Sequence, residues 1–231
     1  MTSGAARHRP YTRGVSTVVD QLPLGPLQTN CYLVRSAPDA TDALVVDPSG
    51  SAAEIELELA RRGARCAAIL VTHSHFDHVL GLADLAEGTG APVHAPGAEL
   101  VVLENPEQFT PAGFAVRPWT PEVLLDGAER LELAGLSLEV VSVPGHSPGH
   151  LAFAAGTSLL SGDVLFAGSV GRTDLPGGDW PTLLASLRAL VERFPLETVV
   201  HPGHGPETTL AAELATNPFL AELRAEPAET G

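Results

Sequence analysis

Most of the nine histidines in this 231-residue chain lie in three short clusters. The first cluster, VTHSHFDHVLG, holds His73, His75, Asp77 and His78 directly after the apolar run AAILV. Residues two apart in an extended segment point the same way, so His73 and His75 can reach one point together. Asp77 and His78 come where the chain turns into the helix-like VLGLADLA and are aimed at a neighbouring point. The pattern therefore indicates two adjacent metal positions.

Three further donors follow apolar runs elsewhere in the chain, His146 in VPGHSPGH, Asp163 in LLSGDVLF and His204 in VVHPGHG. Each comes just beyond the C-terminal end of an expected strand, where a sheet edge could gather them into one cleft. Together with the first cluster they supply five imidazoles and two carboxylates. This set is too large for one tetrahedral zinc and suits two ions that share a carboxylate and a hydroxide. We therefore expect two divalent metal ions. Zinc is the expected metal, and iron and manganese are the alternatives.

Other polar residues near these motifs are expected to support the site or the fold. His150 and His201 flank the ligand turns and are predicted to hold ligands or structure in place rather than to bind metal. Asp47, in VVDPSG, follows a strand and is expected to brace a turn near the metals. His94, in PVHAP, is expected to be an ordinary, partly buried histidine, and His8 lies in the N-terminal residues.

The charge and cysteine content limit the classes of partner. The chain has 28 Asp and Glu against 13 Arg and no Lys, a net charge of -15 that repels nucleic acids and anionic membranes. Cys31 and Cys66 stand far apart, so neither a disulfide framework nor a zinc-thiolate cluster is indicated. With no apolar run that could serve as a membrane span or signal peptide, we expect a cytoplasmic protein with a small-molecule partner. The oligomeric state is left open.

Short apolar runs bounded by Gly, Pro and Asp predict the strands that would position the donors. They cover residues 31–34, 43–46, 67–71, 136–143, 150–155 and 197–200. Two shorter strands, EVLLDG and ERLELAG, have a hairpin-like spacing in the middle of the chain. The strands come in two batches, each accompanied by helices, which predicts an α/β fold of two sheets packed face to face with helices outside.

Three helices are expected, two of them with a start signal. Ser51 to Glu54 spells a capping box ahead of IELELARR. Pro181 stands where a first helical turn would begin, before TLLASLRALVERF. A further helix is expected over about residues 208–223, with Pro218 as a kink or an early stop.

With these motifs in place, the chain resembles the metallo-β-lactamase superfold, whose hallmark is HxHxDH followed by a distant His, a bridging Asp and a last His. The resemblance runs from TNCYLV to HPGHGPETT and implies a four-layer αββα sandwich of two mixed β-sheets flanked by helices. THSHFDHVLG, PGHSPGH, SGDVLFAGSVGRTDLPGGD and HPGHGPETTLAAELATNPFL are similar to segments of the short glyoxalase II-like hydrolases. We therefore expect a flexible tail over residues 1–14 and a single hydrolase domain over residues 15–231.

The resemblance also implies an assignment of ligands. One metal would be held by His73, His75 and His146, the other by Asp77, His78 and His204, with Asp163 bridging. Asp77 and Asp163 would be the catalytic carboxylates, Asp77 by orienting the attacking hydroxide. Asp163 differs from the common zinc β-lactamases, which are expected to carry a cysteine at that position.

Two features depart from full-length glyoxalase II enzymes. Those enzymes carry a C-terminal helical domain whose basic residues grip glutathione, whereas only a short acidic segment follows His204 here. Arg172 stands where the family often has a cation near the carboxylate of the thiol, and it is the candidate substrate anchor. The alternative is a structural arginine paired with Asp174.

The resemblance implies hydrolysis of a 2-hydroxyacyl thioester of a small thiol, such as S-lactoylglutathione, because a weakly basic thiolate leaves without a dedicated acid. A persulfide dioxygenase with one iron on His73, His146 and Asp163 is the first alternative, since GRTD occurs in those enzymes too. The HGPETT ending favours the hydrolase. A lactonase and a non-catalytic metal-binding protein are the remaining alternatives.

Overall fold

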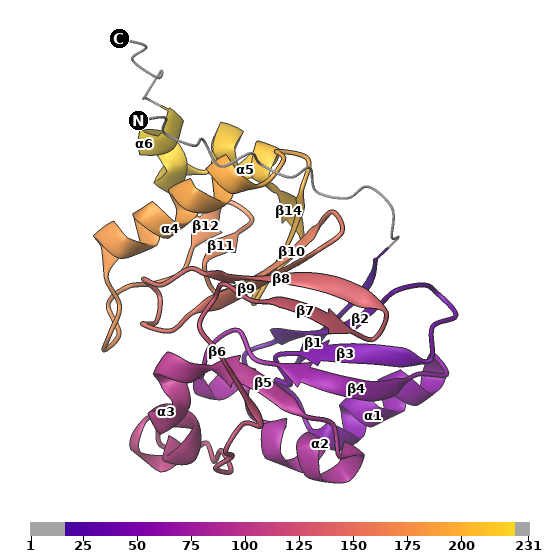
Figure 1. Ribbon diagram of the computed structural model, residues 1–231. Helices are drawn as coiled ribbons and strands as arrows, with labels where there is room; N and C mark the ends of the chain where they lie inside the picture. Colours follow the sequence, from indigo (N-terminus) through magenta and orange to yellow (C-terminus); the bar gives the residue numbers. More distant parts are fainter. Residues whose placement is uncertain (1–16, 225–231) are drawn as a thin grey trace, which may run out of the picture.

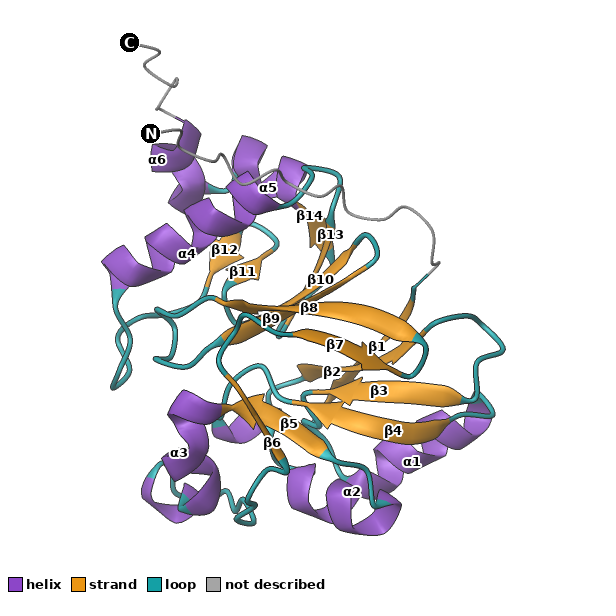
Figure 2. Ribbon diagram, in the orientation of Figure 1, coloured by secondary structure: helices purple, strands orange, loops and turns teal. Residues whose placement is uncertain are grey.

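Two six-stranded sheets face each other, and helices cover the outer side of each (Figures 1 and 2). The structure is a computed structural model that describes residues 17–224. The tail expected over residues 1–14 lies outside the described residues. The predicted four-layer αββα arrangement of two mixed sheets is confirmed. Among the described residues, no helix is both long and apolar enough to cross a lipid bilayer.

The first sheet has the strand order β1-β2-β3-β4-β5-β6. Its strands are β1 Val18–Leu24, β2 Thr29–Arg35, β3 Asp42–Val46, β4 Arg65–Leu70, β5 Val93–Pro96 and β6 Val123–Leu125. The pairs from β1 to β3 are antiparallel, and the pairs from β3 to β6 are parallel. The accompanying helices are α1 Ala52–Arg61, α2 Leu82–Thr89 and α3 Leu100–Glu104.

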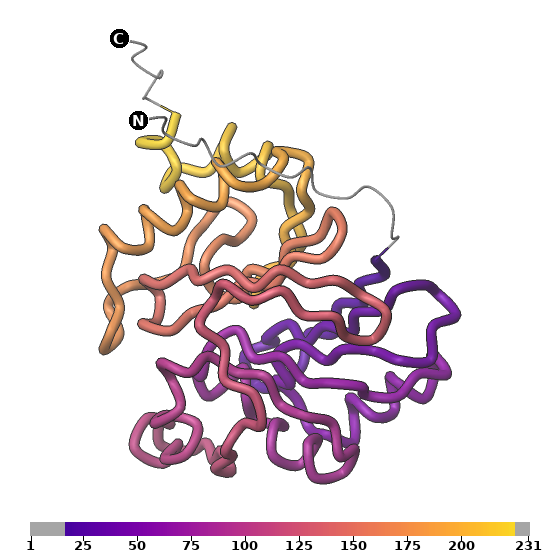
Figure 3. The backbone as a smooth tube through the Cα atoms, in the orientation of Figure 1, coloured from indigo at the N-terminus to yellow at the C-terminus, as the bar shows by residue number. Residues whose placement is uncertain are grey.

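The second sheet has the order β14-β13-β10-β9-β8-β7. Its strands are β7 Arg130–Leu133, β8 Leu136–Ser142, β9 Leu151–Ala155, β10 Ser158–Gly162, β13 Val199–Pro202 and β14 Thr208–Thr209. A small hairpin, β11 Leu165–Phe166 with β12 Ser169–Val170, stands beside it. The outer helices are α4 Trp180–Arg193, α5 Leu210–Thr216 and α6 Ala221–Arg224. Figure 3 shows that the chain completes the first sheet before it enters the second.

Strand β2 shows why the strands read as continuous apolar runs. Cys31 and Leu33 point to the core shared with α1 and α2. Tyr32 and Val34 point to the core between the two sheets, where Phe153 lies fully buried. A strand covered on both faces needs apolar residues at every position rather than at alternate ones. A third core, beneath α4 and α5, completes the layers.

The helix signals agree with the structure. The Ser51 side chain caps α1 and exchanges hydrogen bonds with Glu54, so the capping box is present. Pro181 lies in the first turn of α4, which Asp179 caps. Pro218 ends the helix expected over about residues 208–223, because α5 stops at Thr216 and a 3₁₀ turn follows before α6.

The two short central strands differ from the expected hairpin-like pair. β6 joins the first sheet parallel to β5, whereas β7 pairs with β8 in the second sheet. The link between them crosses from one sheet to the other. Gly127 has a φ of +89°, and a Cβ there would lie 2.5 Å from Ser142 at the end of β8. The Glu129 carboxylate accepts the N–H groups of Asp126, Gly127 and Ala128. These contacts stabilise a crossover in place of a tight turn.

Candidate metal centre

The ends of four strands meet at one edge of the sandwich and bring all seven predicted donors together. The segment after β4 carries the first cluster, and His146, Asp163 and His204 follow β8, β10 and β13. The donors form three overlapping groups whose ligand atoms lie within 4.8 Å of one another. The groups are His73 with His75 and His146, His73 with His78 and Asp163, and Asp77 with His78 and His204.

The first group consists of three imidazoles. His75 Nδ1 lies 3.1 Å from His73 Nε2 and 2.9 Å from His146 Nε2. A tetrahedral ion with Zn–N bonds of about 2.0–2.1 Å holds its ligand nitrogens roughly 3.3 Å apart. The three nitrogens therefore have a spacing that suits one metal ion.

Asp77, His78 and His204 are called the second group below, and they supply one carboxylate and two imidazoles. Asp77 Oδ2 lies 3.3 Å from His204 Nε2 and 3.7 Å from His78 Nε2. Asp163 lies between the two groups, with Oδ1 at 3.3 Å from His78 Nε2 and Oδ2 at 3.6 Å from both His146 Nε2 and His204 Nε2. One carboxylate thus reaches members of both groups, as a bridging ligand must.

Burial and mutual charge set the protonation of these groups. Burial, together with the neighbouring imidazoles, lowers the pKa of His73 well below its ordinary value and that of His75 to about 4. Burial alone would raise the pKa of Asp163, but the imidazoles around it, led by His78, hold that pKa well below its usual range. Neutral imidazoles and ionised carboxylates are the forms that bind metal.

His78 differs from the other imidazoles. Burial alone would lower its pKa, but the Asp163 and Asp47 carboxylates outweigh burial and raise it well above the ordinary value. The two carboxylates therefore favour a positive charge at this position.

Asp47 braces the first cluster, as the sequence predicts. Its Oδ1 accepts the Thr72 N–H at 2.8 Å, and its Oδ2 lies 2.7 Å from Thr72 Oγ1 and 2.9 Å from His78 Nδ1. The bond to Nδ1 leaves His78 Nε2 directed at the cluster. Asp47 has a φ of +51°, a conformation that Asp and Asn tolerate better than most residues.

The described histidines that were not expected to bind metal lie outside the three groups, and His150 lies directly beside them. His150 Nε2 accepts the N–H of Asp163 at 3.0 Å, and its ring stacks on His73 with centroids 4.6 Å apart. His201 lies 3.2 Å from the Ser158 hydroxyl. His94 is buried in β5. None of these three belongs to a group of candidate ligands within residues 17–224.

Close packing of backbone against the ligands explains one glycine at the site. A Cβ on Gly203 would lie 2.1 Å from Asp163 Oδ1 and 2.7 Å from His78 Cε1. Only a glycine lets the turn before His204 approach the carboxylate this closely.

Sequence reasoning missed three polar residues at the start of β2. Thr29 Oγ1 donates to Asp77 Oδ2 at 2.7 Å. Asn30 Nδ2 and Tyr32 Oη donate to the carbonyl of Pro202, and Asn30 also reaches the carbonyl of Gly205. The bonds from Asn30 and Tyr32 hold the turn that carries His204, and the bond from Thr29 holds Asp77. Adjacent buried Thr and Asn at the start of an otherwise apolar strand were the available signal, because buried polar side chains need partners.

Arg172 adopts the alternative that the sequence left open. Its Nε and Nη2 donate to the two carboxylate oxygens of Asp174 at 2.6 and 2.7 Å, and both side chains are exposed. The carbonyl of Arg172 lies 2.7 Å from His146 Nδ1, so the backbone of this residue orients a candidate ligand. Substrate anchoring by the side chain stays a prediction.

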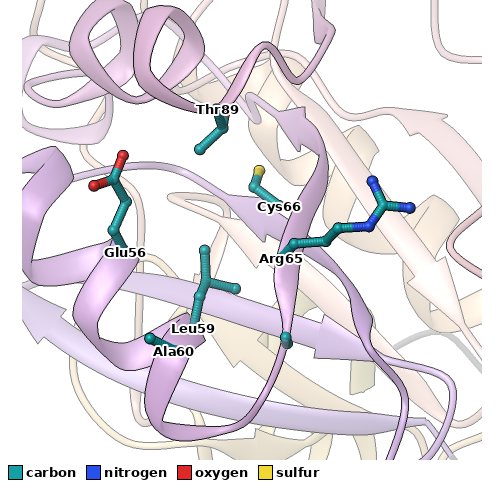
Figure 4. Close-up of a pocket in the computed structure, with 7 residues that line it drawn as sticks. Glu56, Leu59, Ala60, Arg65, Cys66 and Thr89 are labelled. Carbon is teal, nitrogen blue, oxygen red and sulfur yellow. The ribbon is translucent and has the colours of Figure 1, made fainter.

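A separate pocket of about 220 Å³ lies between α1, the start of β4 and the end of α2 (Figure 4). Glu56, Leu59, Cys66 and Thr89 are among its lining residues, and none of the seven donors lines it. Burial raises the pKa of the Cys66 thiol to about 12, so this cysteine is a poor nucleophile. This pocket therefore lies apart from the histidine cluster and holds no activated thiol.

Comparison with known proteins gives a consistent result. The profile of the metallo-beta-lactamase superfamily matches residues 24–204. Hydroxyacylglutathione hydrolase GloC of Haemophilus influenzae is 31% identical over 208 residues, which cover 87% of this chain and 97% of that protein.

Two crystal structures are similar over most of the chain. The B3 metallo-beta-lactamase BLEG-1 has a TM-score of 0.83 and 37% identity, covering 88% of this chain and all of that one. TTHA1623, in a di-iron-bound form, has a TM-score of 0.79 and 43% identity, covering 87% of this chain and all of that one. The chain belongs to the metallo-beta-lactamase superfamily.

Proposed function

We propose that this metallo-hydrolase uses two metal ions to cleave a 2-hydroxyacyl thioester of a small thiol. The observation that carries the proposal is the position of Asp163, whose oxygens reach His146 of the first group and both His78 and His204 of the second. One carboxylate shared by two ligand groups is the arrangement that a dinuclear hydrolase needs. The similarity to GloC supports the thioester as substrate.

The residues fit two divalent cations on physical grounds. His78 Nε2 and Asp163 Oδ1 are buried, and neither has a hydrogen-bond partner among the described residues. Buried polar atoms in folded proteins are almost always satisfied, so these two are suited to a cation. His73, His75 and His146 would hold one ion, and the second group the other, with Asp163 between them.

When bound, two such cations bring the pKa of a water toward neutrality and polarise the carbonyl of the substrate. The chain itself supplies orientation. The Thr29 hydroxyl donates to Asp77 Oδ2 and fixes the rotation of that carboxylate, which can then accept a hydrogen bond from the attacking water. Cys31 and Cys66 are buried with raised thiol pKa values, so neither serves as a nucleophile.

The leaving group explains the choice of a thioester. A thiolate is weakly basic and departs without a proton from a general acid, so the site needs no further titrating side chain for that step. The proposed substrate is a small molecule, and we place the reaction in the cytoplasm, where thiols are kept reduced. The buried free Cys31 and Cys66 are compatible with that compartment.

Hydrolysis of a β-lactam is a second candidate, because BLEG-1 is described as a B3 metallo-beta-lactamase and is 37% identical. The persulfide dioxygenase alternative is weaker. It needs a single iron on His73, His146 and Asp163, whereas Asp77, His78 and His204 have a spacing that suits a second ion. TTHA1623 in its di-iron form supports two ions and iron as one metal they could be.

A substrate panel tests the proposal. Purified protein is freed of metal with a chelator, reloaded with zinc, iron or manganese, and assayed on a hydroxyacyl thioester, a lactone, a β-lactam and a persulfide. We expect the metal-free protein to be inactive and the reloaded protein to prefer the thioester. Preference for the β-lactam would establish the second candidate, and oxygen uptake on the persulfide with one iron per chain would contradict both hydrolases.

A further inference from the structure

Glu99 is a buried carboxyl that the proposed reaction does not use. It ends the 3₁₀ turn Gly97–Glu99 directly after β5, and its residue is 4% exposed. Its Oε2 accepts the N–H and the hydroxyl of Ser74, each at 2.6 Å. Its Oε1 accepts the N–H of Gly149 at 3.0 Å and the hydroxyl of Ser147 at short distance. Four donors from two separate segments therefore converge on one carboxylate.

Those two segments carry the ligands of the first group. Ser74 stands between His73 and His75, after a strand of the first sheet, and Ser147 follows His146, after a strand of the second sheet. The imidazoles of His75 and His146 meet with nitrogens 2.9 Å apart. Glu99 thus joins the two sheets behind the first ligand group.

The packing around the carboxyl is tight. A Cβ on Gly149 would lie 2.7 Å from Glu99 Cγ and 3.0 Å from Ala98 Cβ. The turn that carries His146 therefore rests directly on the Glu99 side chain, and a change in that side chain moves the turn.

We propose that Glu99 is a positioning residue that sets the separation of His75 and His146, and with it the affinity of the first ligand group for its metal ion. This inference rests on the proposed metal site and adds a determinant outside the ligand set. Partners bonded directly to metal ligands typically change metal affinity by about 10–100-fold. Glu99 bonds to the neighbours of the ligands, so we expect an effect at the lower end of that range.

No other side chain reproduces the contacts of Glu99. Each of its oxygens accepts one backbone N–H, from Ser74 on one side and from Gly149 on the other. In Glu99→Gln the NH₂ group must face one of these N–H donors whichever way the amide is turned, so one segment is repelled. Glu99→Asp is one methylene shorter and cannot reach both segments.

Glu213 provides a matched control. It is equally buried, at 3% exposure, and accepts the N–H of Gly168, the hydroxyl of Thr208 and the amide of Asn217. Glu213→Gln therefore also removes a buried carboxylate with a backbone donor, but at α5, where none of its contacts is a candidate ligand. It separates loss of stability from loss of metal affinity.

The test is a titration of metal-free protein with Zn²⁺ in competition with a chromophoric chelator, which yields one dissociation constant for each ion. We expect Glu99→Gln to weaken one constant by about tenfold and leave the other within threefold. Glu213→Gln should lower the melting temperature and leave both constants unchanged. In a His204→Ala background, which retains the first group, Glu99→Gln should weaken the remaining ion by the same factor.

Ser147→Ala tests the same inference if no Glu99 variant folds. It removes one hydroxyl donor and should weaken the same constant by a smaller factor. Two results would overturn this inference and leave the proposed function intact. One is a Glu99→Gln protein with a lower melting temperature and wild-type dissociation constants for both ions. The other is a Ser147→Ala protein with unchanged dissociation constants. A wild-type chain that takes up fewer than two ions would overturn the proposed dinuclear function, and the inference with it.

Discussion

His78 Nε2 and Asp163 Oδ1 lie 3.3 Å apart, and both atoms are buried without a hydrogen-bond partner in the described part of the chain. The two residues come from different sheets, His78 after β4 and Asp163 after β10. Their approach therefore depends on how the sheets pack. Two facing polar atoms of this kind are costly in a protein interior unless something satisfies them. A cation between them would do so, and this explains why the fold tolerates the arrangement.

Substitution of Asp47 tests the support of His78. Asp47→Asn keeps the side-chain size and tolerates the positive φ of +51°, but it replaces one carboxylate oxygen that accepts from Thr72 or His78. We expect the affinity for the ion at the second group to fall by about 10–100-fold with little loss of stability. Stepwise metal titration measures this, and unchanged affinity for both ions would show that Asp47 only shapes the turn.

Thr29→Val removes the hydroxyl that donates to Asp77 Oδ2 at 2.7 Å and keeps the shape of the side chain. A hydrogen bond to a charged group contributes about 1.5–3 kcal/mol. If that bond orients Asp77 for the reaction, kcat should fall by about tenfold or more while both ions remain bound. Steady-state kinetics together with metal content separate the two effects. A drop in metal content without a change in kcat per bound site would assign Thr29 to binding alone.

Gly203→Ala tests the close approach of the His204 turn. Its Cβ would lie 2.1 Å from Asp163 Oδ1, so the turn must move and the second ligand group should open. Gly63→Ala is the control, because Gly63 also lies in a turn, has a φ of +63° and has nothing within 4 Å of the added Cβ. We expect Gly63→Ala to cost about 1 kcal/mol of stability through backbone strain and to bind both ions. Equal metal content in the two variants would contradict this account of Gly203.

Arg172→Ala distinguishes a substrate anchor from a surface ion pair. The exposed pair with Asp174 is expected to contribute little to stability. If the guanidinium leaves Asp174 to bind a carboxylate of the thiol, KM should rise for an anionic thiol ester and stay constant for a neutral one, with kcat retained. If the variant has the wild-type KM for both esters, Arg172 is not a substrate anchor.

The sequence predicted the convergence of the seven donors better than the details of the fold. His73 and His75 share a direction because the segment after β4 is extended, and strand-end positions predicted the convergence of His146, Asp163 and His204. The assignment of β6 and β7 to different sheets could not be predicted, since it depends on the packing of Gly127 against Ser142 at the end of β8. The spacing of residues within each segment does not indicate such a contact.

Glu99 shows the same limit within the site. Its position in PVHAPGAEL gives no local sign that it binds Ser74 and Ser147, which are 25 and 48 residues away. Its residue type gives no sign of burial either, because Glu is rarely buried unless it is paired. Only the packing of the two sheets brings its four donors within reach.

The most direct measurement is a crystal structure of the metal-loaded protein with anomalous scattering recorded at the edge of the bound metal. The account predicts two peaks, one within bonding distance of the His73, His75 and His146 nitrogens and one within bonding distance of Asp77, His78 and His204, with Asp163 touching both. A single peak, or two peaks that Asp163 does not join, would contradict the dinuclear site.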